Sequence, residues 1–269
     1  NVINLTAVMA DGSIVKTGGR AKKSAAGYDL ARLLVGSEGT LGIITELTLR
    51  LQGIPEAIAA GVVAFNDLEG ACNATILTIQ SGIPVARIEL LDPLAIRASN
   101  IYSKMTLPET PTLFVEFHGS ESSVRDQSEA FGAIAKDCGG GDFTWAMKPE
   151  DRARLWQARH DAYWAAHVLK PGGKVVSTDA CVPISRLAEC VTASVADVEE
   201  SGIVAPVVGH VGDGNFHLTI MVDVGDADEV RRAKGVTERL ALRAIAMEGT
   251  CTGEHGVGQG KRAYLLREH

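Results

Sequence analysis

The sequence predicts an α+β fold in which helices lie on one face of a mostly antiparallel β-sheet. From residue 57 onward, short apolar strand-like runs alternate with longer runs that have the 3.6-residue period of amphipathic helices. Glycine- and proline-containing turns separate these runs. Hydrophobic residues make up 46% of the 269-residue chain, which is ample for a buried core in one large domain or in two.

The first part of the chain predicts a β-hairpin followed by a short helix. Residues 2–9 alternate polar and apolar side chains, and Asp11-Gly12 is a turn signal before a second strand that begins at residues 13–16. Asp29 is a candidate N-cap for a helix over residues 30–35, because its carboxylate can accept hydrogen bonds from the first helical N–H groups.

A glycine-rich segment at 36–45 follows and leads into a strand that runs to Leu51. Such a turn can offer backbone N–H groups to a phosphate or a nucleobase. It lacks the Gly-Lys-Ser/Thr ending of a Walker loop, and it is not a Gly-x-Gly-x-x-Gly motif that opens a helix. From the residues alone, a tight structural turn and a ligand cradle remain equally good interpretations.

The pattern changes at Gly53-Ile54-Pro55-Glu56, so we expect a first domain at residues 1–53 and a second at 54–269. Runs of apolar or alternating residues predict strands in the second domain at 57–65, 85–91, 112–117, 143–147 and 174–182. Helical periodicity and capping residues predict helices there at 67–81, 93–103, 121–138, 150–168, 183–201, 227–248 and 262–268.

The stretch from Gly209 to His217 predicts a hairpin with two histidines on one face. Asp213-Gly214 suits a two-residue type I′ turn, because both residues tolerate positive φ. With the turn there, His210 lies directly opposite His217, and Cβ atoms of such pairs are about 4.5–5.5 Å apart. Two imidazoles at that separation can share one metal ion. The alternative is a glycine loop with two unrelated histidines.

A second polar cluster lies at Glu254-His255, between glycines and just after the long helix predicted at 227–248. Two histidines and one glutamate are sufficient ligands for a divalent metal with an open coordination position. We expect Glu254 and His255 to point in opposite directions, so that His255 remains a base beside the metal. The alternative is a glycine-rich helix end with both side chains in solvent. The neighbouring Cys251 is better explained as a packing residue than as a ligand.

The helix predicted at 150–168 places Trp156, Arg159 and Tyr163 on one face, at spacings i, i+3 and i+7. The two aromatic rings can form a wall that presents the guanidinium of Arg159 to a carboxylate in a bidentate manner. The alternative is an aromatic core face with a snorkelling arginine.

Composition excludes several classes of partner. The net charge is −7 and no basic stripe is present, which argues against nucleic-acid binding. No uncharged apolar run reaches 18 residues, so no transmembrane segment is predicted. The five cysteines are odd in number and form no Cys-x-x-Cys motif, which favours reduced thiols in an intracellular compartment.

Five segments together resemble the FAD-linked D-2-hydroxyacid dehydrogenases, which are vanillyl-alcohol-oxidase-type flavoproteins with an FAD-linked oxidase C-terminal domain. The segments are GYDLARLLVGSEGTLGIITELTLRL, LWQARHDAYWAA, STDACVPISRL, GHVGDGNFHL and GTCTGEHGVGQGKR. The resemblance is closest to the cytochrome-type D-lactate dehydrogenases, with glycolate oxidase FAD subunits and D-2-hydroxyglutarate dehydrogenases as relatives. It implies the end of an FAD domain followed by an antiparallel α/β sandwich with ferredoxin-like elements.

The resemblance also implies cofactor sites. The residues expected along the adenine–pyrophosphate part of FAD, largely through the backbone, are Glu38, Gly39, Thr40, Gly42 and Ile44. The residues that match the ligands of a divalent metal, zinc or manganese in relatives, are His210, His217 and Glu254. The family's N-terminal FAD half and its short C-terminal tail have no counterpart here, so we expect the chain to be a fragment that does not hold FAD firmly alone.

Three further positions match the family's active-site residues. His255 matches the proposed catalytic base, Arg159 the residue that holds the substrate carboxylate, and Asn215 an amide near substrate and flavin. The implied reaction is metal-assisted oxidation of a D-2-hydroxy acid, with hydride passing to flavin N5. Glycolate and D-2-hydroxyglutarate are alternative substrates. Cytochrome c, a quinone or another flavoprotein would take the electrons.

The implied location is cytoplasmic or peripheral on the inner membrane in a bacterium, and mitochondrial in a eukaryote. Two classes of function outside this family also remain compatible with the residues. Two histidines, a glutamate and an adjacent base around zinc are also the equipment of a metal-dependent hydrolase. A non-catalytic domain stabilised by a bound metal is the other alternative.

Overall fold

The computed structural model describes residues 1–269, which form two compact units. The smaller unit comprises Asn1–Ile54 and Gly256–Gln259. The larger unit comprises Pro55–His255 and Gly260–His269. None of the helices is long and apolar enough to span a membrane.

The smaller unit contains a three-stranded antiparallel sheet in the order β2-β1-β3 and one short helix. Its elements are β1 (Val2–Met9), β2 (Ile14–Lys16), α1 (Leu30–Leu34) and β3 (Gly42–Leu49). The predicted hairpin is present, with Val8 opposite Ile14 and Gly12 at φ +83° in the turn. Asp29 caps α1 as predicted, because its carboxylate accepts a hydrogen bond from the backbone N–H of Arg32.

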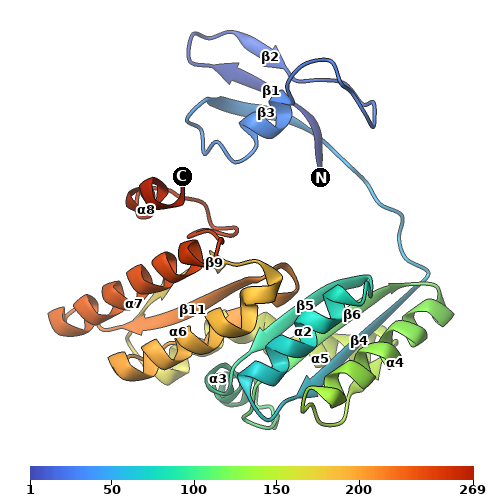
Figure 1. Cartoon of the computed structure of the whole chain (residues 1–269), viewed down its shortest axis with the longest axis vertical. Helices are drawn as coiled ribbons and strands as arrows, with labels where there is room; N and C mark the ends of the chain where they lie inside the picture. The colour runs from blue at the N-terminus through green and yellow to red at the C-terminus, as the bar shows by residue number, and fades with distance from the viewer. The chain divides into compact units, whose positions relative to one another are not determined.

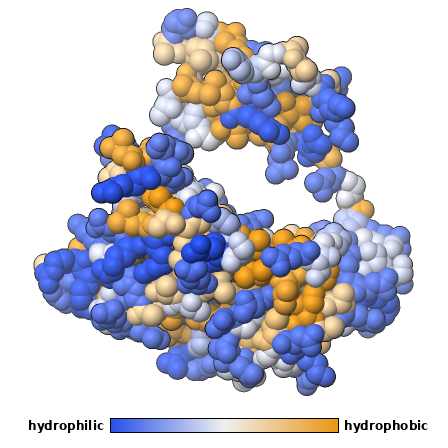
Figure 2. Space-filling model, in the orientation of Figure 1, coloured by the Kyte–Doolittle hydropathy of each residue, from blue (hydrophilic) through white to orange (hydrophobic).

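Strand β3 packs closely against β1 and leaves apolar side chains at the surface. A Cβ on Gly42 would stand 2.8 Å from the carbonyl oxygen of Val8, so strand pairing alone accounts for this glycine. Ile43, Leu47 and Leu49 are 64%, 49% and 54% exposed. Figure 2 shows orange, apolar patches on the surface of this unit.

The larger unit is built on an eight-stranded sheet in the order β7-β4-β6-β5-β10-β11-β8, with β9 paired to β11 (Figure 1). All of its strand pairs are antiparallel, which confirms the predicted class of sheet. The strands are β4 (Ala57–Ala64), β5 (Val85–Leu91), β6 (Thr112–Gly119), β7 (Thr144–Ala146), β8 (Lys174–Ser177), β9 (Ala180–Cys181), β10 (Val207–Gly209) and β11 (Asn215–Val222).

The helices of this unit begin close to their predicted positions, because most have a capping side chain. The α-helices are α2 (Leu68–Gln80), α3 (Pro93–Ser103), α4 (Glu121–Asp137), α5 (Pro149–Ala165), α6 (Leu187–Ser201), α7 (Ala227–Ala246) and α8 (Arg262–Glu268). Three 3₁₀ turns accompany them: η1 (Ala166–Leu169), η2 (Ile184–Arg186) and η3 (Val211–Asp213). Asp67, Asp92, Ser120 and Asp226 accept N-cap hydrogen bonds at α2, α3, α4 and α7.

Helices cover both faces of the sheet, so the prediction that they lie on one face is wrong. Val115 of β6 faces a core that includes residues of α2, α4, α6 and α7. The preceding Phe114 faces a second core that contains Trp156 of α5 and Ile96 of α3. Neighbouring residues of a strand point to opposite faces, and a continuous apolar run such as that of β6 indicates burial on both sides.

Helix α7 is amphipathic along its whole length. Its buried positions Glu229, Ala233, Val236, Leu240 and Ala244 recur at intervals of three or four residues. Charged residues cover the outward side, and the helix lies under the blue region at the lower left of Figure 2.

The strand predicted at 174–182 is interrupted, and the interruption shapes the functional region. It divides into β8 and β9, with Thr178 and Asp179 between them. The hydroxyl of Thr178 accepts a hydrogen bond from the backbone N–H of Leu218 in β11. Thr178 and Asp179 therefore leave the regular ladder and place their polar groups beside β11, where they bind Leu218 and Asn215.

We predict that Gly214→Ala destabilises the larger unit much more than Gly172→Ala. Both glycines have positive φ, +77° and +83°, so both variants carry the cost of a left-handed alanine, about 1–2 kcal/mol. Only at Gly214 would the new Cβ meet another group, the carbonyl oxygen of Val182 at 2.1 Å; at Gly172 nothing lies within 4 Å. Urea unfolding should show an additional loss of roughly 1–3 kcal/mol for Gly214→Ala. Equal free energies of unfolding for the two variants would contradict the close packing of the hairpin on β9.

Candidate active site

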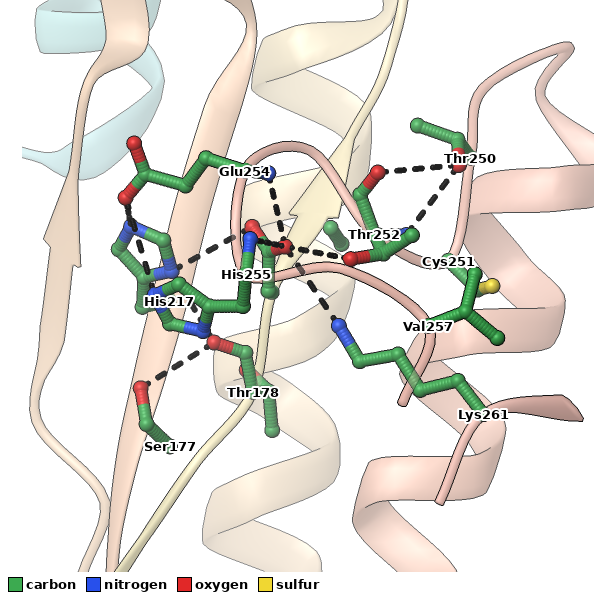
Figure 3. A network of polar contacts seen from close by, with 12 residues as sticks. Ser177, Thr178, His217, Thr250, Cys251, Thr252, Glu254, His255, Val257 and Lys261 are labelled. Carbon is green, nitrogen blue, oxygen red and sulfur yellow. Dashed lines mark hydrogen bonds and ion pairs between the residues drawn. The ribbon is translucent and has the colours of Figure 1, made fainter. Parts of the chain in front are cut away.

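Two histidines and one glutamate converge on one point of the larger unit. Glu254 Oε1 lies 3.2 Å from His210 Nε2 and 3.3 Å from His217 Nε2. His210 follows β10, His217 lies in β11, and Glu254 lies in the segment after α7. Figure 3 shows the carboxylate of Glu254 directed at the ring of His217. The structure thus brings together three residues expected to bind metal.

The hairpin that carries the two histidines has a different register from the predicted one. Val208, not His210, lies opposite His217. The turn is longer than a two-residue type I′ turn, because the 3₁₀ turn η3 and Gly214 at φ +77° connect the strands. The error is two residues, and an even shift keeps side chains on the same face of the hairpin. The two rings are therefore still neighbours, with centroids 5.6 Å apart.

Hydrogen bonds to the Nδ1 atoms orient both rings. His210 Nδ1 lies 2.7 Å from Glu89 Oε1, and His217 Nδ1 lies 3.0 Å from the carbonyl oxygen of Thr178. Both partners accept hydrogen bonds, so each Nδ1 carries a proton, and each Nε2 faces the carboxylate of Glu254. The hydrogen bond to Glu89 raises the pKa of His210, whereas burial lowers the pKa of His217.

His255 belongs to the same cluster, which corrects the expectation that it points away from Glu254. Its ring stacks on that of His217, with centroids 4.8 Å apart and planes inclined by 6°. Its Nε2 lies 3.7 Å from Glu254 Oε1. Adjacent residues point apart in an extended strand, but this segment is a tight series of turns, so both side chains reach one site.

The fully buried carboxylate of Asp179 holds this segment in place. Asp179 Oδ2 accepts hydrogen bonds from the backbone N–H groups of Glu254 and His255, at 2.9 and 2.8 Å, and from the hydroxyl of Thr252 at 2.9 Å. Lys261 Nζ approaches the same oxygen at 3.5 Å. Burial by itself would raise the pKa of Asp179, but these hydrogen bonds and one from Asn215 outweigh it and lower that pKa well below its ordinary value.

Asn215 lies next to the histidine cluster and binds Asp179. Its Nδ2 donates to Asp179 Oδ1 at 2.8 Å and to the carbonyl oxygen of Ala180 at 3.0 Å, whereas its buried Oδ1 has no partner in the chain. It lines a cavity of about 380 Å³ together with residues that include His210 and Glu254. A Cβ on Gly253 would lie 2.1 Å from Asn215 Nδ2, so glycine is required for this packing.

A cavity of about 170 Å³ contains the remaining candidates of this unit. Its lining residues are Arg159, Tyr163, Ser177, Val208, His210, His217, Thr219, Glu254 and His255. Arg159 is held there by an ion pair of 2.9 Å between its Nε and Glu89 Oε2. It is the only lysine or arginine of the lining.

The predicted aromatic wall around Arg159 is only partly present. Trp156 is 3% exposed and belongs to the core, with its ring centroid 6.0 Å from that of Phe114. The cation over its face is Arg87, at 3.7 Å from the ring centroid, rather than Arg159. Tyr163 does line the cavity and is 50% exposed.

The residues expected to contact FAD lie in the smaller unit. Glu38 has φ +50°, and its carboxylate accepts hydrogen bonds from the N–H groups of Val257 and Gly258 in the same unit. The hydroxyl of Thr40 donates to the carbonyl oxygen of Ser37. Gly39 has positive φ and open space where a Cβ would stand, whereas Ile44 is a strand residue that is 37% exposed.

The sequence interpretation missed Glu89 and Asp179, the two buried carboxylates of the site. Glu89 had a detectable signal, because it is a charged residue inside the otherwise apolar end of β5, where it is only 6% exposed. Asp179 had none, because its position depends on the interruption between β8 and β9.

Residues 54–269 match the family of FAD linked oxidases, C-terminal domain. The chain belongs to this family. This FAD-linked oxidase chain is 54% identical, over its full length, to probable D-lactate dehydrogenase, mitochondrial, of Danio rerio. It is 46% identical, again over its full length, to D-lactate dehydrogenase [cytochrome], mitochondrial, of Arabidopsis thaliana. It spans about half of these relatives, 54% and 47% of their lengths.

Solved structures confirm the fold of the FAD-linked oxidase chain. The 4-ethylphenol oxidase of Gulosibacter chungangensis superposes with a TM-score of 0.70 at 14% identity, over 92% of this chain and 56% of that chain. Substrate-bound p-cresol methylhydroxylase superposes with a TM-score of 0.66 at 16% identity, over 92% and 56% of the two chains. Their similarity concerns the fold alone.

We predict that Asp179→Asn lowers stability in a pH-dependent manner. The lowered pKa of Asp179 contributes stability above the pKa of an unfolded aspartate, about 3.9, and this contribution is lost as the pH falls through and below that value. The asparagine variant lacks it at every pH. The difference in free energy of unfolding between the two proteins should therefore narrow by roughly 0.5–1 kcal/mol between pH 7 and pH 3.5 in urea titrations. A difference that stays constant over this range would contradict the assignment.

Proposed function

We propose that the protein of which this chain forms part oxidises a D-2-hydroxy acid to the 2-oxo acid, with D-lactate as the favoured substrate. The main support is the cavity that combines the cluster of His210, His217 and Glu254 with Arg159 and His255. The match to FAD-linked oxidases and the names of the relatives support oxidation rather than hydrolysis.

The cluster of His210, His217 and Glu254 fits a divalent metal. Two imidazole nitrogens and a carboxylate oxygen are a ligand set typical of zinc and compatible with manganese. The surroundings support the same assignment, because each histidine has its Nδ1 bound to an acceptor and directs its Nε2 at the point where Glu254 Oε1 lies. A metal there would supply a Lewis acid for the hydroxyl of the substrate.

A neighbouring set of Asp179, His217 and His255 also lies within ligand distance. It is the weaker candidate, because the Asp179 carboxylate already accepts hydrogen bonds from the chain on both oxygens. The carboxylate of Glu254 has no comparable commitment to backbone N–H groups, and half of its side-chain surface (48%) is exposed.

Arg159 is suited to bind the carboxylate of the substrate. Its Nε is paired with Glu89, which leaves the two Nη groups for a ligand in the cavity. Two parallel N–H···O bonds to one carboxylate fix the orientation of the substrate as well as its charge. The lining contains no second arginine or lysine, which favours a substrate with one carboxylate over a dicarboxylate such as 2-hydroxyglutarate.

His255 is placed to take the proton of the substrate hydroxyl. It lines the same cavity as Arg159, and its ring is held by stacking on His217 and by hydrogen bonding of its backbone N–H to Asp179. A neutral imidazole is an effective base near neutral pH. FAD, when bound, would supply the hydride acceptor for the oxidation, while these residues bind the substrate and take its proton.

We further propose that residues 1–53 are part of the FAD-binding domain and that residues 54–269 form the substrate and metal domain. Gly36 and Gly39 have positive φ and no atom within 4 Å of where a Cβ would stand, so the backbone of this turn is open to close approach by a ligand. The other residues that would lie along FAD in this proposal are Glu38, Thr40, Gly42 and Ile44.

We extend the proposal to the electron acceptor and the location, for which the names of the relatives are the support. The relatives named D-lactate dehydrogenase [cytochrome], mitochondrial, support cytochrome c as acceptor and, for a eukaryotic source, a mitochondrial protein. A relative named glycolate oxidase subunit, from Bacillus subtilis, is 36% identical over 98% of this chain and keeps glycolate as an alternative substrate.

We predict that alanine at residue 210, 217 or 254 removes both metal and turnover in the complete enzyme, whereas His255→Ala keeps the metal. Loss of a general base should slow flavin reduction by roughly 10²–10⁴-fold. Elemental analysis gives the metal content, and anaerobic mixing with D-lactate gives the rate at which the flavin absorption band bleaches. Loss of metal in His255→Ala would overturn the assignment of roles, and absence of bleaching in the unaltered enzyme would overturn the oxidation itself.

We predict that Arg159→Lys raises KM for D-lactate far more than it changes flavin content. The lysine ammonium has no planar fork to bind a carboxylate with two parallel hydrogen bonds. Loss of one charge-assisted hydrogen bond, about 1.5–3 kcal/mol, corresponds to roughly a 10- to 150-fold rise in KM. Steady-state kinetics and bound flavin per protein measure the two effects. Unchanged KM and kcat would remove Arg159 from the substrate site.

A further inference from the structure

The carboxylate of Glu89 connects His210, of the proposed metal site, with Arg159, the proposed substrate-binding residue. Its Oε1 lies 2.7 Å from His210 Nδ1, and its Oε2 lies 2.9 Å from Arg159 Nε. These three residues come from β5, the end of β10 and α5. Glu89 is 6% exposed, so its charge is almost completely removed from water.

A buried carboxylate is retained at low cost only when each oxygen has a charged or strongly polar partner. For Glu89, one partner is the histidine assigned to the metal and the other is the arginine assigned to the substrate. We propose that Glu89 is a positioning residue that fixes the spacing between the metal site and the carboxylate-binding arginine; this inference rests on the function proposed above. The Glu89 carboxylate thus holds in place two residues that a 2-hydroxy acid must reach at the same time.

The contact also determines which edge of Arg159 faces the ligand. With Nε paired to Glu89, the guanidinium has its two Nη groups left for a ligand, and rotation about the side chain is restricted. On the other side, the acceptor at Nδ1 makes His210 Nε2 a better donor to a metal. One carboxylate therefore acts on substrate binding and on metal binding.

The neighbouring strand offers a closely matched control. Glu116 of β6 is 8% exposed, and it also bridges an arginine and a histidine. Its Oε2 lies 2.8 Å from Arg87 Nη2, and its Oε1 lies 2.8 Å from His118 Nε2. Neither partner lines the cavity of Arg159 and His255. Glu116 thus shares the burial and the partner types of Glu89, but not its partners in the site.

The test compares Glu89→Gln with Glu116→Gln in the complete flavin-loaded enzyme. Glutamine has one oxygen acceptor and one NH₂ donor, so it can accept a hydrogen bond from His210 or from Arg159 but not from both. We expect Glu89→Gln to weaken the binding of Zn²⁺ to the metal-stripped enzyme by roughly 10- to 100-fold. With saturating Zn²⁺, its KM for D-lactate should rise by about 10-fold.

For Glu116→Gln, both constants should stay within about threefold of the unaltered enzyme, even if its thermal midpoint falls. Glu89→Asp provides a second variant if the glutamine form does not fold. It keeps the charge but is one methylene shorter, so it cannot reach both partners at these distances. We expect the same direction of change in both constants, with a folded protein verified by its thermal midpoint.

His210→Ala separates the two proposals. If His210→Ala keeps the Zn²⁺ affinity of the unaltered enzyme, the proposed metal site is wrong. If His210→Ala loses Zn²⁺ while the Glu89 variants keep the original affinity and KM, the metal site stands and the positioning role of Glu89 is overturned. A change in only one of the two constants, or equal changes in Glu116→Gln, would also overturn it.

Discussion

The hydrogen bonds to Asp179 are the interaction on which the arrangement of the candidate site depends. This carboxylate accepts from two consecutive backbone N–H groups, those of Glu254 and His255, and so fixes a segment that has no regular secondary structure. The same side chain accepts from Asn215, in the strand that carries His217. A segment after α7 is thereby tied to the central sheet, and Glu254 meets histidines from another part of the chain.

The candidate site contains two kinds of residue: buried hydrogen-bond acceptors, and the side chains that these acceptors hold facing the cavity. Glu89, Thr178 and Asp179 are buried acceptors that hold donors of the site in fixed orientations. His210, His217 and Arg159 use one edge for these anchors and direct the other edge into the cavity. Such anchoring matters because ligands and bases must be placed within fractions of an ångström for efficient chemistry.

Much of this organisation could be predicted from the sequence, and the failures have identifiable physical causes. Caps such as Asp29 and Asp67 and turns such as Asp11-Gly12 act locally, so the elements that they delimit were predicted well. The register of the histidine hairpin was wrong, because Asp213-Gly214 is the end of a 3₁₀ turn and not a two-residue turn. The convergence of His210, His217 and Glu254 was predicted both from the hairpin and from the resemblance of whole motifs. Glu89 gave a local signal as a charged residue in an apolar strand end, whereas the position of Asp179 depends on tertiary pairing that no local pattern encodes.

The pairing of β5 with β10 also has a consequence for the time at which the site forms. Glu89 and His210 are separated by 121 residues, and Glu254 reaches its partner only after the whole of α7 has been made. Contacts between residues so distant in sequence form late, because the entropy of closing the intervening chain must be overcome before they stabilise anything. The side chains of His210, His217 and Glu254 therefore come together only after the central sheet and α7 have folded, so the cavity that they line is among the last features of the chain to form.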